Sequence, residues 1–462
     1  MATSELIGAA ELKRRLEKKD ISAAEFAADV ILREKQNTSL NAISSFDPNL
    51  LMENAKRADQ RRQSGNAEPL CGIPLIVKDN INTVAFPTTA GTTALQNHTP
   101  ATDAGVIVAL EGQGAIIAAK SGMHELAFGV TSNNSVTGAI RNPHDQSKIP
   151  GGSSGGTAAA VAAGIFPAGL GTDTGASVRL PAALCGIVGF RPTVGRYASN
   201  GIVPISHTRD TAGTFGNKVE DIVLLDSVLS GSSTAARKKD INQVVLGICR
   251  EVLFENLEPE VEKAIQEQLK TLESAGARLV EVNISDIWSH NEEFSFPVVL
   301  YEVMRDLPAY LKEHAPEVSF EKLIEQIGSP DVAGAFKSQL GGGAMPETAY
   351  QAAINEHRPA MRAIYAEAFA QHNLTALAFP TSPLRATDIG SDETVSLNGE
   401  QVPTFPTFIR NTDLGSNLGV PGISLPCQNV NGLPIGIEFD GVMGRDQDLL
   451  ELALTVEEVL SH

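Results

Sequence analysis

Three side chains of this 462-residue chain could together carry out nucleophilic catalysis. Lys78 precedes Ser153 and Ser177, and the two serines lie 24 positions apart in a glycine-rich stretch. A serine hydroxyl becomes a good nucleophile only when a neighbouring group removes its proton. Glycines around Ser177 would let backbone N–H groups converge on one point, as stabilisation of an oxyanion requires. The three residues therefore indicate a hydrolase that has a base, a proton relay and a nucleophile without using a histidine.

The segments around these residues resemble the amidase signature family, serine hydrolases of C–N bonds with a Ser-cisSer-Lys triad. The order of the segments and the gaps between them agree with that family. The matching segments are Gly72–Asn80, Arg141–Pro143, Gly151–Gly164, Gly171–Arg179 and Cys185–Thr193.

The resemblance implies a role for each residue of the set. Ser177 would be the nucleophile, Ser153 the relay for its proton, and Lys78 the base. The oxyanion hole would consist of four successive backbone N–H groups, those of Thr174, Gly175, Ala176 and Ser177. Since Lys78 must be neutral to act as a base, its pKa must fall by about three units from ~10.4, which costs about 4 kcal/mol. Burial can supply a shift of this size.

Within the family, further segments are most similar to the subgroup of bacterial indoleacetamide hydrolases, with mandelamide hydrolases next. These segments are Met123–Gly129, Ser132–Asn134, Gly195–Tyr197, Thr208–Gly213, Ile409–Asp413 and Gly436–Gly441. Met123, His124 and Ser132 are candidate substrate contacts, although His124 could equally be a packing residue. The subgroup implies hydrolysis of a small primary aryl-acetamide, similar to indole-3-acetamide, to the carboxylic acid and ammonia through an acyl-enzyme.

Two alternative functions stay open within the family. One is an amidase for another amide or hydrazide, such as mandelamide. The other is the glutamine-hydrolysing subunit of a tRNA-dependent amidotransferase, a related protein that works inside a complex. Ala176 argues against the second, because that subunit usually has Gly-Gly before the nucleophile, and the Arg209–Gly213 run argues against it too.

Composition restricts the partners. The chain has 36 basic and 55 acidic residues, a net charge of −19, which repels nucleic acid phosphates. Its four cysteines have neither metal nor disulfide spacing, so we expect no metal and no cofactor. We see no signal peptide and no membrane-span pattern, and we therefore expect a cytoplasmic protein without membrane contact. The expected partner is a small-molecule amide, and the expected state is a monomer or a homodimer.

Alternating strand and helix patterns predict a layered α/β fold. The family resemblance implies a mixed central sheet covered by helices on both sides. We expect one amidase domain over residues 1–462, with N-terminal helices at 1–65, the signature core at 68–230 and a variable helical region on the substrate side at 290–350.

Local patterns predict several individual elements. Ser22–Glu25 is a capping box that begins a helix. Val244–Cys249, Glu258–Ala275 and Arg278–Val282 have the pattern of a βαβ unit. The remaining predicted elements are helices at Asn49–Arg62, Val106–Gln113 and Thr157–Ala163, and strands at Ile73–Val77, Ala115–Ala119, Leu374–Phe379 and Ile435–Phe439.

Overall fold

One mixed sheet organises the computed structural model, which describes residues 6–232 and 236–461. Within these ranges, eleven strands form this sheet in the order β1-β3-β2-β6-β8-β7-β14-β15-β11-β9-β10. The strands are β1 (Ile43–Phe46), β2 (Pro74–Lys78), β3 (Ile116–Ser121), β6 (Ala168–Asp173), β7 (Val188–Arg191), β8 (Thr211–Gly216), β9 (Val245–Ile248), β10 (Arg278–Glu281), β11 (Ala376–Pro380), β14 (Gly422–Val430) and β15 (Leu433–Asp440). The predicted mixed α/β fold is confirmed.

The middle of the sheet brings the predicted catalytic segments together. Strand β2 pairs in parallel with both β3 and β6, and Val77 lies opposite Leu170 of β6. All five residues of β2 are buried, as are all six of β6. Burial on both faces explains why β2 is a continuous apolar run rather than an alternating one. Because β2 and β6 are parallel, their carboxyl ends meet at the same edge of the sheet, and Lys78 is the last residue of β2.

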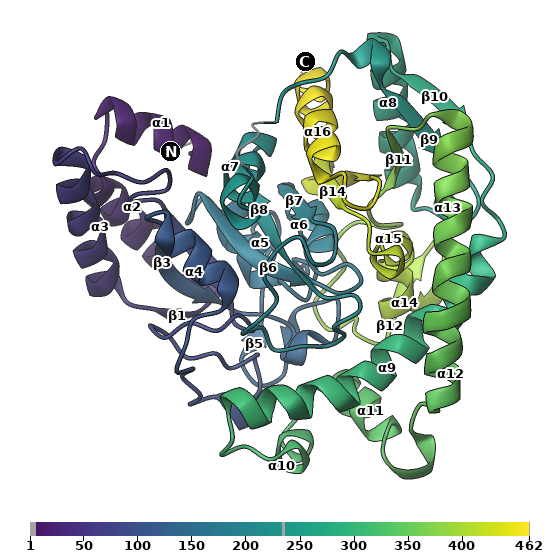
Figure 1. The fold of residues 1–462 in the computed structure, drawn as a ribbon, viewed down its shortest axis with the longest axis horizontal. Helices are drawn as coiled ribbons and strands as arrows, with labels where there is room; N and C mark the ends of the chain where they lie inside the picture. The colour runs from purple at the N-terminus through teal and green to yellow at the C-terminus, as the bar shows by residue number, and fades with distance from the viewer. Residues whose placement is uncertain (1–5, 233–235, 462) are drawn as a thin grey trace.

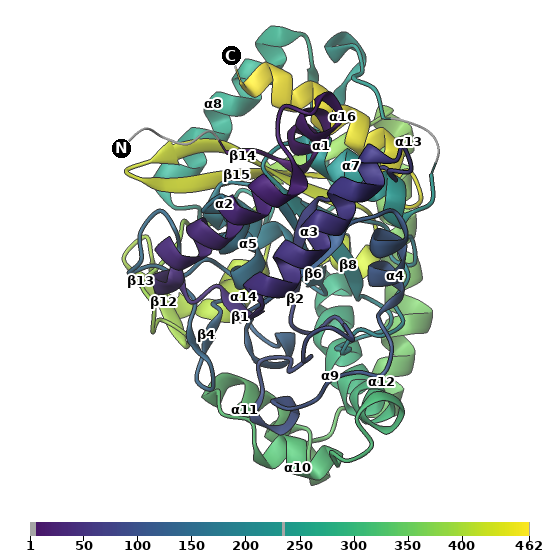
Figure 2. The same ribbon diagram turned by 90° about the vertical axis from the view of Figure 1, so that its left-hand side faces the viewer.

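Helices surround the sheet, and Figures 1 and 2 show their arrangement. The N-terminal helices α1–α3 lie at one end of the molecule, and α13 lies at the opposite end (Figure 1). The helices outside the 290–350 region are α1 (Ala9–Lys18), α2 (Ala23–Gln36), α3 (Pro48–Gln63), α4 (Gly105–Gly112), α5 (Gly155–Ala162), α6 (Arg179–Cys185), α7 (Val219–Leu229), α8 (Pro259–Ala275), α13 (Arg358–His372), α14 (Thr404–Ile409), α15 (Asp413–Leu418) and α16 (Asp446–Leu460). None of the helices in the described part of the chain has both the length and the apolar character of a membrane span.

Several local predictions are confirmed. The capping box at Ser22 and Glu25 is present at the start of α2. The predicted βαβ unit is β9–α8–β10, with its two strands paired in parallel. By contrast, the sequence patterns do not predict β1, β6, β7, β8 and β14. Residues 1–5, on which the expectation of no signal peptide partly rests, lie outside the described ranges.

The region around 290–350 is helical, as predicted, and it lies along one edge of the molecule (Figures 1 and 2). It consists of α9 (Ile287–His314), α10 (Phe320–Glu325), α11 (Pro330–Ser338), a short 3-10 turn at Gly341–Gly343 and α12 (Glu347–Ala352). The carboxylate of Glu125 accepts hydrogen bonds from the backbone N–H groups of Gly328 and Ser329, just before α11. Polar contacts therefore attach this region to the signature core.

The capping box of α2 gives a test of stability. The Ser22 hydroxyl accepts from the Glu25 N–H group at 3.1 Å. Ser22→Ala removes this acceptor, and we expect the free energy of unfolding to fall by about 1 kcal/mol. Ser22→Asp keeps an acceptor and should lose much less. Urea unfolding of the three proteins measures the difference, and an equal loss in Ala and Asp would contradict the capping role.

Candidate active site

The structure brings Lys78 and Ser153 into direct contact. Lys78 Nζ lies 2.7 Å from Ser153 Oγ, and it donates a hydrogen bond to Thr172 Oγ1 at 2.8 Å. Asn80 Nδ2 donates to the same Thr172 oxygen at 3.0 Å. These contacts follow from the parallel pairing of β2 and β6, since Lys78 ends β2 and Thr172 lies near the end of β6. The peptide bond between Gly152 and Ser153 is cis.

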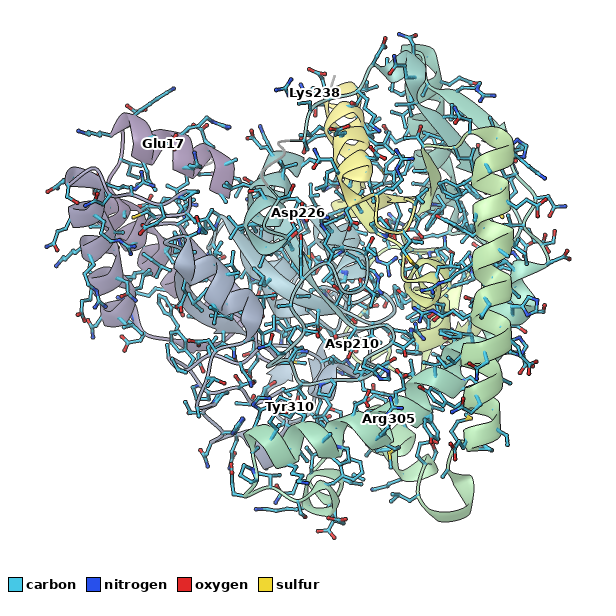
Figure 3. All side chains as sticks on the ribbon, viewed as in Figure 1. Glu17, Asp210, Asp226, Lys238, Arg305 and Tyr310 are labelled. Carbon is cyan, nitrogen blue, oxygen red and sulfur yellow. The ribbon has the colours of Figure 1, made fainter. Side chains whose placement is uncertain are left out.

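The environment of Lys78 favours its neutral form. Its side chain has no exposed surface. Burial lowers the pKa of Lys78 to about 7, against the opposing negative charges of Asp173 and Asp210. Asp210 lies between the central sheet and α9, and Figure 3 labels it together with Arg305 and Tyr310 on α9. A buried lysine near pKa 7 can accept a proton at neutral pH.

Ser177 lies in the turn between β6 and α6, and Asp173 holds this turn. Asp173 Oδ2 accepts from the Val178 N–H group at 3.0 Å and from Arg179 Nε at 3.1 Å. Its other oxygen accepts from Arg179 Nη2 at 3.1 Å and from Arg191 Nη1 at 3.0 Å. Burial alone would raise the pKa of Asp173, but the charges of Arg179 and Arg191 outweigh burial and lower it. The carboxylate is therefore ionised and fixes the turn that carries Ser177.

The carbonyl groups of the same turn are also held. Arg209 Nε donates to the Thr174 carbonyl at 3.0 Å, and Arg179 Nη2 donates to the Gly175 carbonyl at 3.1 Å. In a trans peptide the N–H group points away from the carbonyl, so the N–H groups of Gly175 and Ala176 point away from the two arginines. Among the described residues, none accepts a hydrogen bond from the N–H groups of Gly175, Ala176 or Ser177. These donors can receive a negatively charged oxygen.

A small, largely apolar cavity of about 70 Å³ lies against this turn. Four of its wall residues are the predicted oxyanion-hole residues 174–177. The others are Ala127, Phe128, Gly129, Val130, Ile205, Arg209, Ser295, Phe296, Val299, Leu300, Phe405, Ile409 and Asp413. The cavity thus draws on residues 127–130, on the helical region at 290–350 that was expected on the substrate side, and on a segment around 405–413.

The one basic side chain among the described residues of this wall is already paired. Arg209 Nη2 donates to Asp413 Oδ1 at 2.5 Å, and Arg209 Nη1 lies 3.2 Å from both oxygens of Ser295. Both Arg209 and Asp413 are buried. The opposite charges compensate each other, so the wall offers no free charge to a substrate.

The structure does not bring Met123, His124 and Ser132 to the cavity wall. All three are fully buried. Ser132 Oγ donates to the Gly151 carbonyl at 2.8 Å, and the His124 N–H group donates to the Ser153 carbonyl at 3.1 Å. The His124 ring accepts from the Ser132 N–H group at 3.2 Å and lies 3.0 Å from an oxygen of Asp331. These residues support the loop that carries Ser153, and a Cβ on Gly155 would collide with Ser132.

A group of possible metal ligands lies elsewhere, at His207, Glu302 and Asp306. Their ligand atoms lie within 4.8 Å of one another. Arg305 Nη2 is 2.7 Å from His207 Nδ1, and Glu302 accepts from Tyr350 at 2.9 Å and from Thr208 Oγ1 at 2.5 Å. The positively charged Arg305 guanidinium thus lies beside the atoms that would have to bind a metal ion, so these atoms are not free to act as ligands.

Sequence reasoning missed several residues of the site. Arg209, Ile409 and Asp413 lie in segments that marked the subgroup, so their motifs were a usable signal. Thr172 lies inside a signature segment, directly after Gly171. Phe296 and Phe405 have no motif around them and are brought together only by the fold.

Comparisons with known proteins agree with this geometry. The sequence profile of the Amidase family matches residues 29–450. An indoleacetamide hydrolase of Rhizobium radiobacter is 42% identical over 452 residues, which cover 98% of this chain and 96% of that protein. A mandelamide hydrolase of Pseudomonas putida is 40% identical over 442 residues, which cover 92% of this chain and 86% of that protein. A crystal structure of an amidase superposes with a TM-score of 0.86 at 33% identity, covering 98% of this chain and 99% of that one.

These matches extend over nearly the whole chain rather than over one motif. They include the segments that hold Lys78, Ser153 and Ser177. The chain therefore belongs to the amidase signature family, and it is an enzyme that hydrolyses amide bonds.

Proposed function

We propose that this enzyme hydrolyses small, uncharged primary arylacetamides, similar to indole-3-acetamide, to the carboxylic acid and ammonia. The observation that carries the proposal is the apolar cavity that contains Ser177 and whose one arginine is already paired with Asp413. An aromatic ring gains roughly 25 cal/mol per Å² of apolar surface that it buries in such a cavity. A charged acyl group would lose its hydration there without gaining a partner.

The reaction starts with proton transfer along the buried contact. Neutral Lys78 Nζ accepts the proton of Ser153 Oγ, from which it lies 2.7 Å. Ser153 Oγ in turn accepts the proton of Ser177, and the Ser177 oxygen attacks the amide carbonyl. The carbonyl oxygen becomes negatively charged and is stabilised by the N–H groups of residues 174–177.

The relay then runs in the opposite direction. The proton passes through Ser153 to the amide nitrogen, the C–N bond breaks, and ammonia leaves. The acyl group stays on the Ser177 oxygen as an ester. A water molecule loses its proton to the same relay, attacks this ester and releases the carboxylic acid, which restores the Ser177 hydroxyl.

Only one of the two alternatives predicts a different cavity. Hydrolysis of mandelamide would require only one more hydroxyl in the same cavity, so it belongs to the same substrate class. Hydrolysis of glutamine would require partners for an α-ammonium and an α-carboxylate. The paired Arg209 and the apolar side chains of the wall favour the arylacetamide.

Replacement of the three catalytic candidates tests the mechanism. Ser177→Ala should abolish turnover of phenylacetamide, and Ser153→Ala and Lys78→Ala should each lose several orders of magnitude in kcat, because each removes a step of the proton path. Ser154→Ala is the matched control, since the Ser154 hydroxyl forms hydrogen bonds only with the Thr172 backbone among the residues that the structure describes. Ammonia release measures turnover, and thermal unfolding checks the fold. More than about 1% residual activity in Ser177→Ala would show that another residue is the nucleophile.

The pH dependence tests the base. Lys78 acts when neutral, so kcat/KM should rise with pH through a midpoint near 7 and then level off. The negative charge of Asp210 raises the pKa of Lys78, so Asp210→Asn should move the midpoint to lower pH. The profile of kcat/KM against pH comes from initial rates at low substrate concentration, measured from about pH 5 to about pH 10 at constant ionic strength. A midpoint that moves upward in Asp210→Asn would contradict the assignment of Lys78.

Substrate comparison tests the specificity. Indole-3-acetamide and phenylacetamide should exceed acetamide and glutamine in kcat/KM by at least about tenfold, or about 1.4 kcal/mol of transition-state stabilisation. The reason is the apolar surface that a ring buries and a short chain does not. Ammonia release from the four amides is measured with one enzyme preparation. Equal or better activity on glutamine would support the amidotransferase alternative instead.

A further inference from the structure

A second compartment adjoins the active-site cavity. It measures about 260 Å³, against about 70 Å³ for the inner cavity, and its walls include no residue of the 174–177 turn. The two spaces have six wall residues in common: Phe128, Gly129, Val130, Phe296, Leu300 and Phe405. The outer compartment therefore shares part of its wall with the cavity that Ser177 lines.

Two aromatic rings belong to the walls of both compartments. Phe296 of α9 and Phe405 of α14 line both spaces, and their ring centroids lie 6.4 Å apart at an interplanar angle of 51°. Phe296 is 46% exposed, which is unusual for so large an apolar side chain. We call these two rings the partition, because both of them line the two compartments.

The outer compartment differs from the inner one in charge. The residues that line it alone are Thr131, Asp331, Ala335, Ser338 and Asp392. Asp392 accepts hydrogen bonds from Thr131 Oγ1 at 2.7 Å and from Asn133 Nδ2 at 2.6 Å, and both donors are neutral. One carboxylate oxygen of Asp331, Oδ2, lies 3.0 Å from Nε2 of the buried His124 ring. Among the described residues of these walls, none is a lysine or an arginine.

We propose that the outer compartment is a subsite for the far end of elongated arylacetamides, and that it selects uncharged or cationic ends over anionic ones. The proposal rests on the proposed function, in which the aryl ring occupies the inner cavity. A para substituent on that ring extends past Phe296 and Phe405. It then meets the carboxylates of Asp331 and Asp392, which attract a cation and repel an anion.

Three phenylacetamides of matched length test the charge selection: those with a 4-aminomethyl, a 4-hydroxymethyl and a 4-carboxylate group. In low salt, kcat/KM for the cationic amide should exceed that for the anionic amide by at least about tenfold, with the neutral amide between them. In Asp392→Asn this ratio should fall by about threefold or more, because one uncompensated carboxylate is lost.

Asp388→Asn is the matched control. Asp388 lies four positions before Asp392, pairs with Lys148 at 2.8 Å on the surface, and does not line the outer compartment. Asp388→Asn removes the same charge from the same loop. The ratio of kcat/KM for the cationic amide to that for the anionic amide should therefore stay at the wild-type value. Equal rates on the cationic and anionic amides, or an equal change in Asp388→Asn and Asp392→Asn, would overturn the proposal.

The partition is tested by Phe296→Ala. This change should raise kcat/KM for biphenyl-4-ylacetamide relative to phenylacetamide by about fivefold or more, since the longer ring system then reaches the outer compartment. N-benzyl phenylacetamide is the second probe, because its extra ring lies on the nitrogen. If Phe296→Ala favours the N-benzyl amide and not the biphenyl amide, the compartment receives the amine side and the proposal is wrong.

The unsubstituted amides separate this proposal from the proposed function. If the wild-type enzyme fails to hydrolyse phenylacetamide and indole-3-acetamide, the proposed function fails. If it hydrolyses them but shows no dependence on the charge of the para substituent, only the subsite fails.

Discussion

One buried carboxylate determines where Ser177, the proposed nucleophile, lies. Asp173 ends β6, accepts from the backbone at Val178, and binds the guanidinium groups of Arg179 and Arg191. The Asp173 carboxylate therefore joins four segments into one unit: strand β6, the turn with Ser177, the first residues of α6 and the end of β7. Loss of one partner of such a pair leaves an uncompensated buried charge, which typically costs 3–5 kcal/mol. Arg191 also donates to the Arg209 carbonyl at 2.6 Å, so the unit extends to the arginine that holds the Thr174 carbonyl.

The cavity wall is built differently from this unit. Ser295, Phe296, Val299 and Leu300 come from one side of α9, and Phe405 and Ile409 come from α14. Arg209 joins the two parts, because it contacts the Thr174 carbonyl on one side and Ser295 and Asp413 on the other. The buried Glu302 of α9 adds a second connection through Thr208. The cavity wall and the turn that carries Ser177 are therefore held by a common, small set of buried polar contacts.

The sequence predicted the parts of the enzyme whose chemistry is local. The glycine-rich segments marked Lys78, Ser153 and Ser177, and apolar runs predicted β2 and the β9–α8–β10 unit. Strand β6 was missed because its residues, Ala-Gly-Leu-Gly-Thr-Asp, have little strand propensity and are extended through pairing with β2 and β8. The partition between Phe296 and Phe405 could not be predicted, since more than a hundred positions separate its two residues. Likeness at Met123–Gly129 indicated substrate contact for Met123 and His124, whereas neither residue lines the cavity and His124 bonds the loop that carries Ser153.

The attachment of the helical region has a consequence for how such enzymes diversify. Residues 287–352 form one uninterrupted stretch of chain, and at the 328–331 bend it meets the core through Glu125 and His124. Neither of these two residues touches the inner cavity. Because α9 also contacts Arg209 through Ser295 and Thr208 through Glu302, mutations that remodel the helices must keep these two contacts if the turn with Ser177 is to stay in place. New acyl preferences can then arise at the other wall positions of α9, which are Phe296, Val299 and Leu300.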